Sequence, residues 1–376
     1  MKPVHAARLD RWLGAEATER LSTSHRDWYG PPIALAGIPG RVYVTPGGDF
    51  VGTLRAGEFY SAADRLNDIG LRLKMAMRRA SIAQASQLNT GFASLTTLLA
   101  ALRNGDTQTV PYNKIAASSV ADSCRSEWYL DGQPGIGATP SGAPGGDATT
   151  NSTAGALALD PAPSGKTQHL LSWEHSMGTG VGTGFSWLLY DRLFQVAKTM
   201  NSNATESVTG VPTRYQSNTQ GDENFAGGNF LIPEVRTTLA SGAHNHDTIL
   251  YRNQAGTDAQ TAPSIAGISA CVANRIDLPT FRWFMPLAAG DTGIADLHQI
   301  QYSTNLIATG TLNYVIGHPI AWMPTPISFA VCSIDCITTA FSLARIFDNA
   351  CLALMCVWVG SAQTASPGGF IRTVMG

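Results

Sequence analysis

Charged side chains are scarce in this sequence. Asp, Glu, Lys and Arg make up 14% of its 376 residues, whereas an ordinary globular domain carries roughly 25%. The net charge is −2, so the chain lacks the basic excess with which generic nucleic-acid-binding proteins meet phosphates. Its hydrophobic fraction of 44% excludes a charge-rich disordered chain. We therefore expect a folded protein with few surface charges and no specific nucleic-acid binding.

Long apolar runs are missing as well. No stretch reaches the roughly 18 apolar residues that a membrane-spanning helix needs, and the nearest, 350–360, is typical of a protein core. The first residues lack the apolar centre of a secretory signal. These features predict synthesis in a cytosol and no membrane partner.

Cysteines are few, and four of the six lie near the C-terminus. Cys351 and Cys356 belong to the apolar run Ala350–Trp358, where small buried thiols fit well. Zinc-binding pairs usually lie on tight turns among polar residues. We interpret these cysteines as core thiols, with a zinc site as the alternative, and predict no metal ligands among them.

Proline, glycine and charge divide the chain into three parts. Residues 1–57 are rich in Pro and Gly and predict an extended N-terminal arm. Residues 58–105 form a helical segment: one long amphipathic helix is expected over 58–88, and a second over 93–103, ended by Asn104 and Gly105. Residues 106–376 are expected to form a β-rich body.

The N-terminal parts also hold much of the basic charge. Residues 1–80 contain 12 basic and 8 acidic residues, a net charge of +4, which leaves −6 for the remainder. Arg65, Arg72 and Arg79 lie seven residues apart on the long helix. They either form a solvated helix face or bind an acidic surface on another copy of the protein. We name these three arginines as the partner-binding residues.

The body contains short runs of aromatic and β-branched residues, separated by Asn, Gly, Pro and Thr, as in strands. These runs are 169–173, 185–190, 229–235, 247–252, 282–285 and 312–317. Their spacing predicts a β-sandwich or jelly-roll-like body. The expected fold class is therefore mainly β with N-terminal helices, α+β overall. The Gly- and Pro-rich loop at 131–168 should be either disordered or laid across a neighbouring subunit.

The sequence contains no convincing catalytic motif. His169 and His175 lie near Ser172 and Ser176, but strand alternation would place histidines and serines on opposite faces. The P-loop-like end at 164–167 follows two prolines that remove amide donors, and acidic residues are too scattered for glycoside chemistry. We predict no catalytic residues, no cofactor and no enzyme activity.

A second group of histidines raises the question of a metal. His244 and His246 are two residues apart, so they could lie on one face of a strand, with Asp247, His298 and His318 as further candidates. Metal binding needs three or four convergent groups, which a sequence does not display. We interpret these residues as polar loop histidines and predict no metal ligands.

From about residue 93 to 372, the sequence resembles a loose group of head and decoration-type virion proteins of tailed bacteriophages. The resemblance depends on the order of several short motifs: SEWYLDGQPG at 126–135, WLLYDRL at 187–193, TRY at 213–215, YRNQAGT at 251–257, MPLAAGDTGI at 285–294 and GTLNYVIGHPIA at 310–321. It implies a structural protein of a virion, made in the bacterial cytoplasm, with no catalytic residues. Its partners would be other copies of itself and other virion proteins such as the major capsid protein.

Three functions follow, in order of preference. The first is a head protein, either a capsid-shell subunit or a cement (decoration) protein, that stabilises the particle through many contacts between subunits. The second is a tail or receptor-binding adsorption protein. The third is a glycan-acting enzyme of the β-sandwich type, for which the sequence offers few acid–base pairs.

Overall fold

The computed structural model describes residues 42–44, 50–53, 92, 94–115, 124–177, 183–199, 203–279, 282–303, 310–327, 331–337, 343–358 and 366–376. The chain forms two compact units, 1–83 and 84–376. In the first unit, the described residues are an antiparallel pair of strands, β1 (Val42–Val44) and β2 (Phe50–Thr53). The long helix expected over 58–88 lies outside the described residues, as do Arg65, Arg72 and Arg79.

The second unit begins with α4 (Leu95–Asn104), the one helix in the described ranges. Ser94 caps its first turn, because its hydroxyl accepts a hydrogen bond from the amide of Thr97 while Thr97 bonds back to the Ser94 amide. Gly105 ends the helix with a φ of 76°. The short helix predicted over 93–103 is confirmed, whereas the plural N-terminal helices are not supported by the described residues.

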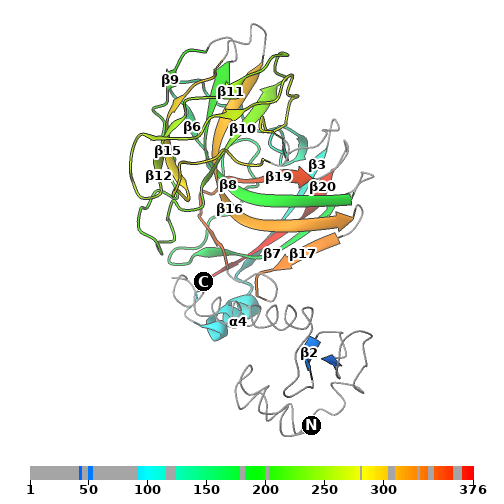
Figure 1. The fold of residues 1–376 in the computed structure, drawn as a ribbon. Helices are drawn as coiled ribbons and strands as arrows, with labels where there is room; N and C mark the ends of the chain where they lie inside the picture. Colours follow the sequence, from blue (N-terminus) through cyan, green and yellow to red (C-terminus); the bar gives the residue numbers. More distant parts are fainter. Residues whose placement is uncertain are drawn as a thin grey trace. The chain divides into compact units, whose positions relative to one another are not determined.

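The body consists of two antiparallel sheets (Figure 1). Sheet one has the order β17-β7-β20-β3-β5, with β18 also paired to β7. Its strands are β17 (Val331–Asp335), β7 (Gln168–Met177), β20 (Pro367–Met375), β3 (Thr107–Ile115), β5 (Asp131–Gln133) and β18 (Arg345–Ile346).

Sheet two has the order β10-β16-β8-β19-β4, with β6 paired to β8. Its strands are β10 (Phe230–Thr237), β16 (Thr311–Ile327), β8 (Thr183–Thr199), β19 (Leu352–Trp358), β4 (Cys124–Ser126) and β6 (Asp147–Ala148). The long strands β8 and β16 pair along almost their whole length. Their register shifts twice, next to Gly317 and Pro319, as at β-bulges, which bend strands.

Eight of these strands have the order of a jelly roll. In chain order, β3, β4, β7, β8, β16, β17, β19 and β20 alternate between the sheets, except that β8 and β16 are neighbours in sheet two. The result is β3-β20-β7-β17 in one sheet and β4-β19-β8-β16 in the other, which is the two-sheet arrangement of jelly rolls. The mainly β body predicted from the sequence is therefore confirmed.

A tight apolar core lies between the sheets. Trp173 and Ile371 of sheet one and Trp187, Leu189 and Leu354 of sheet two belong to the same buried cluster. Each strand contributes alternate residues to it, because successive side chains point to opposite faces of a sheet. Burial of these side chains supplies the main stabilisation of the body.

A long insertion, residues 200–310, connects β8 to β16. Besides β10 it contains β15 (Ile294–Ile300) and five shorter strands: β9 (Glu206–Ser207), β11 (Asn245–His246), β12 (Leu250–Asn253), β13 (Gln260–Thr261) and β14 (Ile265–Ala266). They form a four-stranded sheet, β13-β12-β15-β9, and the pair β11-β14. The insertion shares a second apolar cluster with sheet two.

The strand expected at 282–285 and a disordered loop at 131–168 are wrong, whereas contact of that loop with a neighbouring subunit stays a prediction. Residues 282–285 are irregular rather than a strand, since Pro279 and Pro286 flank them and Trp283 faces outwards. The loop at 131–168 packs on its own chain: Leu157 and Leu159 enter the core between the sheets. Gly137 lies so close to the Trp128 ring that a Cβ atom there would be 2.2 Å from it. Apolar anchors thus order this loop within the subunit.

The other predicted strands are found as β7, β8, β10, β12 and β16. The interpretation of the C-terminal cysteines as core thiols also holds for Cys351 and Cys356, since both are fully buried beside or within β19. Within the described ranges, no helix has both the length and the apolar character that crossing a bilayer requires. The division at 57/58 and 105/106 stays a prediction.

Candidate functional site: a buried histidine–aspartate cluster

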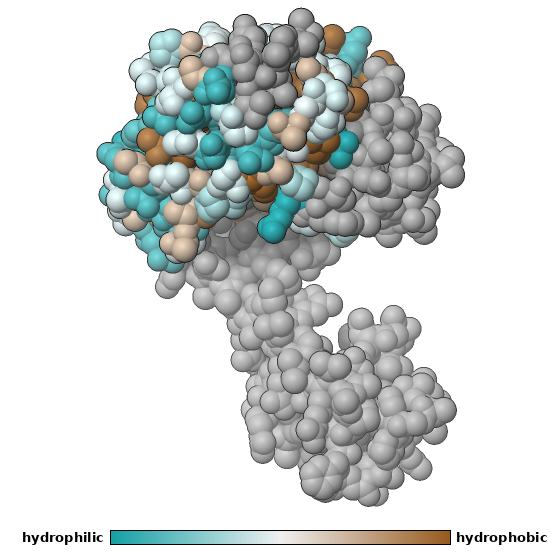
Figure 2. Space-filling model, turned by 45° about the horizontal axis from the view of Figure 1, so that its top comes forward, coloured by the Kyte–Doolittle hydropathy of each residue, from teal (hydrophilic) through white to brown (hydrophobic). Residues whose placement is uncertain are grey.

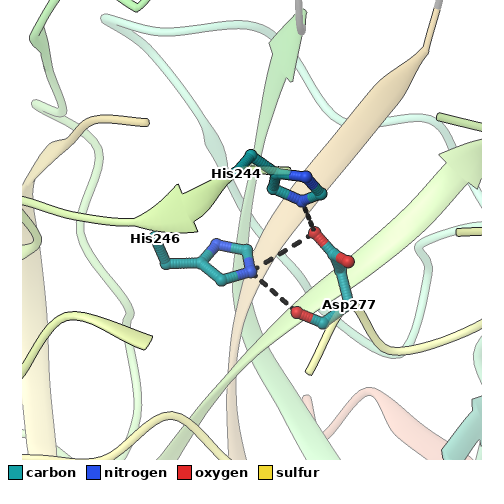
Figure 3. A group of neighbouring side chains, drawn as sticks. All are labelled: His244, His246 and Asp277. Atoms are coloured by element: carbon teal, nitrogen blue, oxygen red, sulfur yellow. Dashed lines mark hydrogen bonds and ion pairs between the residues drawn. The ribbon is translucent and has the colours of Figure 1, made fainter. Parts of the chain in front are cut away.

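Two of the candidate histidines come together with an aspartate that the sequence analysis did not select. His244 and His246 flank Asn245, whose side chain is exposed, so strand alternation turns both histidines inwards. Asp277 reaches them from an irregular segment more than thirty residues later. These three residues form the histidine–aspartate cluster (Figure 3). A contact between such distant positions depends on the fold, and no local sequence pattern announces it.

The three side chains converge on one carboxylate oxygen. The distance from Asp277 Oδ2 is 2.7 Å to His244 Nε2 and 3.3 Å to His246 Nε2. His246 Nε2 also lies 2.7 Å from the main-chain oxygen of Asp277. All three residues are buried, with His246 and Asp277 fully inaccessible.

A second layer of contacts fixes each member. His244 Nδ1 lies 3.3 Å from the carbonyl oxygen of Gly242, and His246 Nδ1 lies 2.9 Å from the Tyr314 hydroxyl. The other carboxylate oxygen of Asp277, Oδ1, accepts a hydrogen bond of 2.6 Å from the amide of Ile268. Each ring thus has a set orientation, with Nε2 directed at Asp277.

The electrostatics favour charge on the cluster. Burial alone would raise the pKa of Asp277, but hydrogen bonds from His244 and His246 outweigh it and hold that pKa well below its usual range. Burial likewise opposes the cationic form of His244, yet the hydrogen bond to Asp277 and its negative charge raise the pKa of this imidazole. Asp277 and His244 thus form a buried pair that favours opposite charges.

The remaining candidates lie apart from the cluster. His298 lies 3.5 Å from Asp258 and 3.6 Å from Asp296, and its side chain is 36% exposed. His318 stacks on Tyr215, with ring centroids 3.7 Å apart, and bonds to Asn229. Asp247, unlike the two histidines, is only half-buried. The structure thus brings together two of the five residues proposed from the sequence.

The histidines of β7 do not form a catalytic group with the nearby serines. His175 bonds to Tyr112 at 2.6 Å, and His169 bonds to Thr167 at 2.8 Å. Both histidines are fully buried, whereas Ser172 and Ser176 are half-buried. Strand alternation separates His175 from these serines, as predicted. The register shift of β7 between Leu170 and Ser172 interrupts the alternation before His169, which packs on Phe92.

The surface carries a second feature of interest, a pair of tryptophans. The rings of Trp283, in the insertion, and Trp322, in β16, have centroids 5.4 Å apart. Their exposed fractions are 37% and 36%. On the face in Figure 2, hydrophobic residues are interspersed with hydrophilic ones in small patches. The tryptophan pair is a partly exposed apolar feature that joins the insertion to β16.

Comparison with known proteins adds little. No protein-family model matches the chain, and no curated protein matches it. A structure of infectious bursal disease virus, Gt strain, is 10% identical over 72% of this chain and 80% of that chain, with a TM-score of 0.14. The VP2 subviral particle of the same virus is also 10% identical, over 71% and 79%, with a TM-score of 0.13. TM-scores this low support no inference about this chain. The functional argument therefore depends on its strand order and side chains.

Proposed function

We propose that this protein is a structural subunit of a virion, in the head of a bacteriophage, as a shell or decoration subunit. The observation that carries the proposal is the jelly-roll strand order with a long insertion between β8 and β16. Jelly rolls recur in viral capsids, in lectins and in cupins. Since one fold serves several functions, the surfaces and the interior must decide among them.

The outer face of sheet one supports a subunit in contact with its neighbours. Phe370 lies beside Pro111 and Glu174 in the register of the strands, and it is 45% exposed. Val331, at the edge strand β17, is 73% exposed. An apolar surface with few charges is typical of the core of a protein–protein interface. Other copies of the chain and other virion proteins are the proposed partners.

The interior argues against an enzyme of the cupin type. Such an enzyme needs room for substrate within the sandwich, but Trp173, Trp187 and Met323 fill the space between the sheets here. The histidine–aspartate cluster is also closed to solvent, so a substrate would have no direct access to it. A role in assembly fits a filled interior better than catalysis does.

The alternative is an adsorption protein of the tail. Its specific support is the exposed pair Trp283–Trp322, because exposed tryptophans are frequent anchors of binding sites. In that case the pair would contact a glycan or protein on the host surface.

Sedimentation of the purified full chain, with electron microscopy, tests the proposal. Particle-sized assemblies, or a monomer that binds phage heads lacking it, would support a head protein. A compact trimer that binds host cells would support adsorption, and a monomer that degrades polysaccharide would overturn both. Phe370→Asp should weaken assembly without lowering the melting temperature. Val211→Asp is the matched control, since it places the same charge at an exposed apolar position of the insertion.

The basic residues Arg65, Arg72 and Arg79 add a separate part of the proposal. We infer that they bind an acidic surface of a neighbouring subunit, because the chain beyond residue 80 carries a net charge of −6. Reversal of all three charges should reduce assembly, most strongly at low salt. If assembly of that variant is unchanged, the three arginines do not belong to the interface. The rest of the proposal would not be affected.

A further inference from the structure

We propose that His244, His246 and Asp277 bind one divalent transition-metal ion of the zinc type, which joins two distant segments of the insertion. The site is independent of the virion function and makes a different prediction about the isolated chain. It is a structural centre, buried in the protein, and it takes no substrate.

The ligand types and spacing suit such an ion. Zinc bound by His nitrogen and Asp oxygen at about 2.0–2.1 Å in tetrahedral geometry separates its ligand atoms by roughly 3.3 Å. Asp277 Oδ2 and His246 Nε2 are 3.3 Å apart. His244 Nε2 lies 2.7 Å from the same oxygen, so it needs to retreat by only about 0.6 Å to reach that spacing. All three atoms lie within 4.8 Å of one another.

The surrounding contacts resemble those of metal-bound histidine. A ligating imidazole usually bonds through its other nitrogen to a carbonyl, carboxylate or water. Here the Nδ1 atoms of His244 and His246 face the Gly242 carbonyl and the Tyr314 hydroxyl, while both Nε2 atoms point inwards (Figure 3). The Ile268 amide donates a hydrogen bond to Asp277 Oδ1, and the other oxygen, Oδ2, is directed at the two rings.

The local backbone closes the site. A Cβ atom on Gly267 would lie 2.1 Å from His244 Nε2 and 2.8 Å from Asp277 Oδ2, so only glycine permits this approach. The fourth donor would be a water or the Asp277 carbonyl oxygen, which already lies 2.7 Å from His246 Nε2. Zinc sites that lack an open position for substrate are structural.

The position of the site explains what an ion would stabilise. His246 belongs to β11, whose partner β14 gives a ladder of only two residue pairs, and such an isolated pair of strands is marginal in water. Tyr314 belongs to β16 of the jelly roll. An ion at the cluster would join β11 to the segment around Asp277 within the insertion, and its binding energy would contribute to folding. The hydrogen bond between His246 and Tyr314 would link this centre to β16.

The alternative is that hydrogen bonds alone hold the cluster. In that case His244 donates from both ring nitrogens, to Gly242 and to Asp277, and no metal competes. The two cases differ in metal content and in the coordination spectrum, neither of which depends on assembly into particles.

The experiment uses the full chain, stripped with a chelator and titrated with Zn²⁺ and with Co²⁺. We expect one equivalent of zinc per chain by mass spectrometry and a visible cobalt spectrum of tetrahedral type. The melting temperature should rise by about 5 °C at a hundredfold excess of zinc over its dissociation constant. Asp277→Asn should abolish all three results, whereas the matched control His298→Gln should retain them.

Several outcomes would overturn the proposal. These are binding of less than one equivalent by the wild-type chain, an octahedral cobalt spectrum, or equal zinc binding by Asp277→Asn. If Asp277→Asn does not fold, the stoichiometry and cobalt spectrum of the wild-type chain decide alone. Failure of assembly in the earlier sedimentation experiment has no bearing on this result, so the two proposals can fail separately.

Discussion

The jelly roll and the insertion between β8 and β16 are ordered by different means. In the jelly roll, hydrogen bonds between long strands satisfy the backbone N–H and C=O groups, and apolar side chains such as Trp173 and Trp187 fill the interior. In the insertion, where most strands are short, polar side chains bond to the main chain of distant loops. The contrast shows that side-chain hydrogen bonds can anchor a loop-rich segment that lacks a long backbone ladder.

The anchors of the insertion are specific. The side-chain nitrogen Nδ2 of Asn229 donates to the carbonyl oxygens of Tyr215 and Ile294, at 3.0 and 2.9 Å. Arg214 binds Asp191 of β8 through two hydrogen bonds of 2.7 and 2.8 Å. Both kinds of contact link segments far apart in the sequence. The insertion should therefore be sensitive to loss of single polar groups, and the jelly roll to loss of volume.

The largest effect is expected from Trp187→Ala in the jelly roll. Trp187 is fully buried between the sheets, and a Trp→Ala change in a core typically costs 3–5 kcal/mol of unfolding free energy. We expect a value near the upper end of this range, or no soluble protein. Denaturant unfolding of the variant measures it. A loss below about 1 kcal/mol would show that the two sheets do not pack tightly here.

The next effect tests the polar anchors of the insertion. Arg214→Met leaves Asp191 buried without its charged partner, which should cost about 3 kcal/mol. The matched control is Arg372→Met, because Arg372 and its partner Glu174 are 48% and 34% exposed, with 3.3 Å between them. Exposed pairs contribute about 0–1 kcal/mol. Equal losses in the two variants, measured by denaturant unfolding, would contradict the difference between buried and exposed anchors.

The third prediction concerns the stability of the jelly roll at acidic pH. Burial lowers the pKa of His175 to about 3, so the folded protein keeps this imidazole neutral while the unfolded chain protonates it near pH 6.5. The stability that His175 contributes is thus complete above pH 6.5 and falls as the pH drops towards 3. The loss should reach about 2 kcal/mol at pH 5.

His175→Gln checks this contribution, since the glutamine side chain can still form a hydrogen bond with the Tyr112 hydroxyl. Unfolding free energies at pH 8 and pH 5 should differ less in the variant than in the wild type. His169, whose pKa burial lowers to about 4, should give a similar but smaller effect. If His175→Gln retains the full pH dependence of the wild type, the acid sensitivity has another source.

The two regions also differed in how far the sequence could predict them. The strands β7, β8 and β16 contain aromatic and β-branched runs, and such local patterns predict strands well. The ordered path of 131–168 was missed, because Leu157 and Leu159 are single apolar residues in a Gly- and Pro-rich loop. Similarly, the spacing of His244 and His246 suggested a shared face, but Asp277 joins them only through the folded chain.

The smallest effect on stability is expected at the exposed tryptophan pair, which bears on what the insertion does rather than how it folds. Trp283→Ala removes the same side chain as Trp187→Ala, but from a position 37% exposed, so the unfolding free energy should change by no more than about 1 kcal/mol. Particle assembly or host-cell binding should nevertheless weaken, because tryptophans at contact sites contribute disproportionately to affinity. Sedimentation and cell-binding assays beside thermal unfolding separate the two effects. A loss of unfolding free energy close to that of Trp187→Ala would mean that the tryptophan pair belongs to the packed core. The pair would then not be a binding site for a partner.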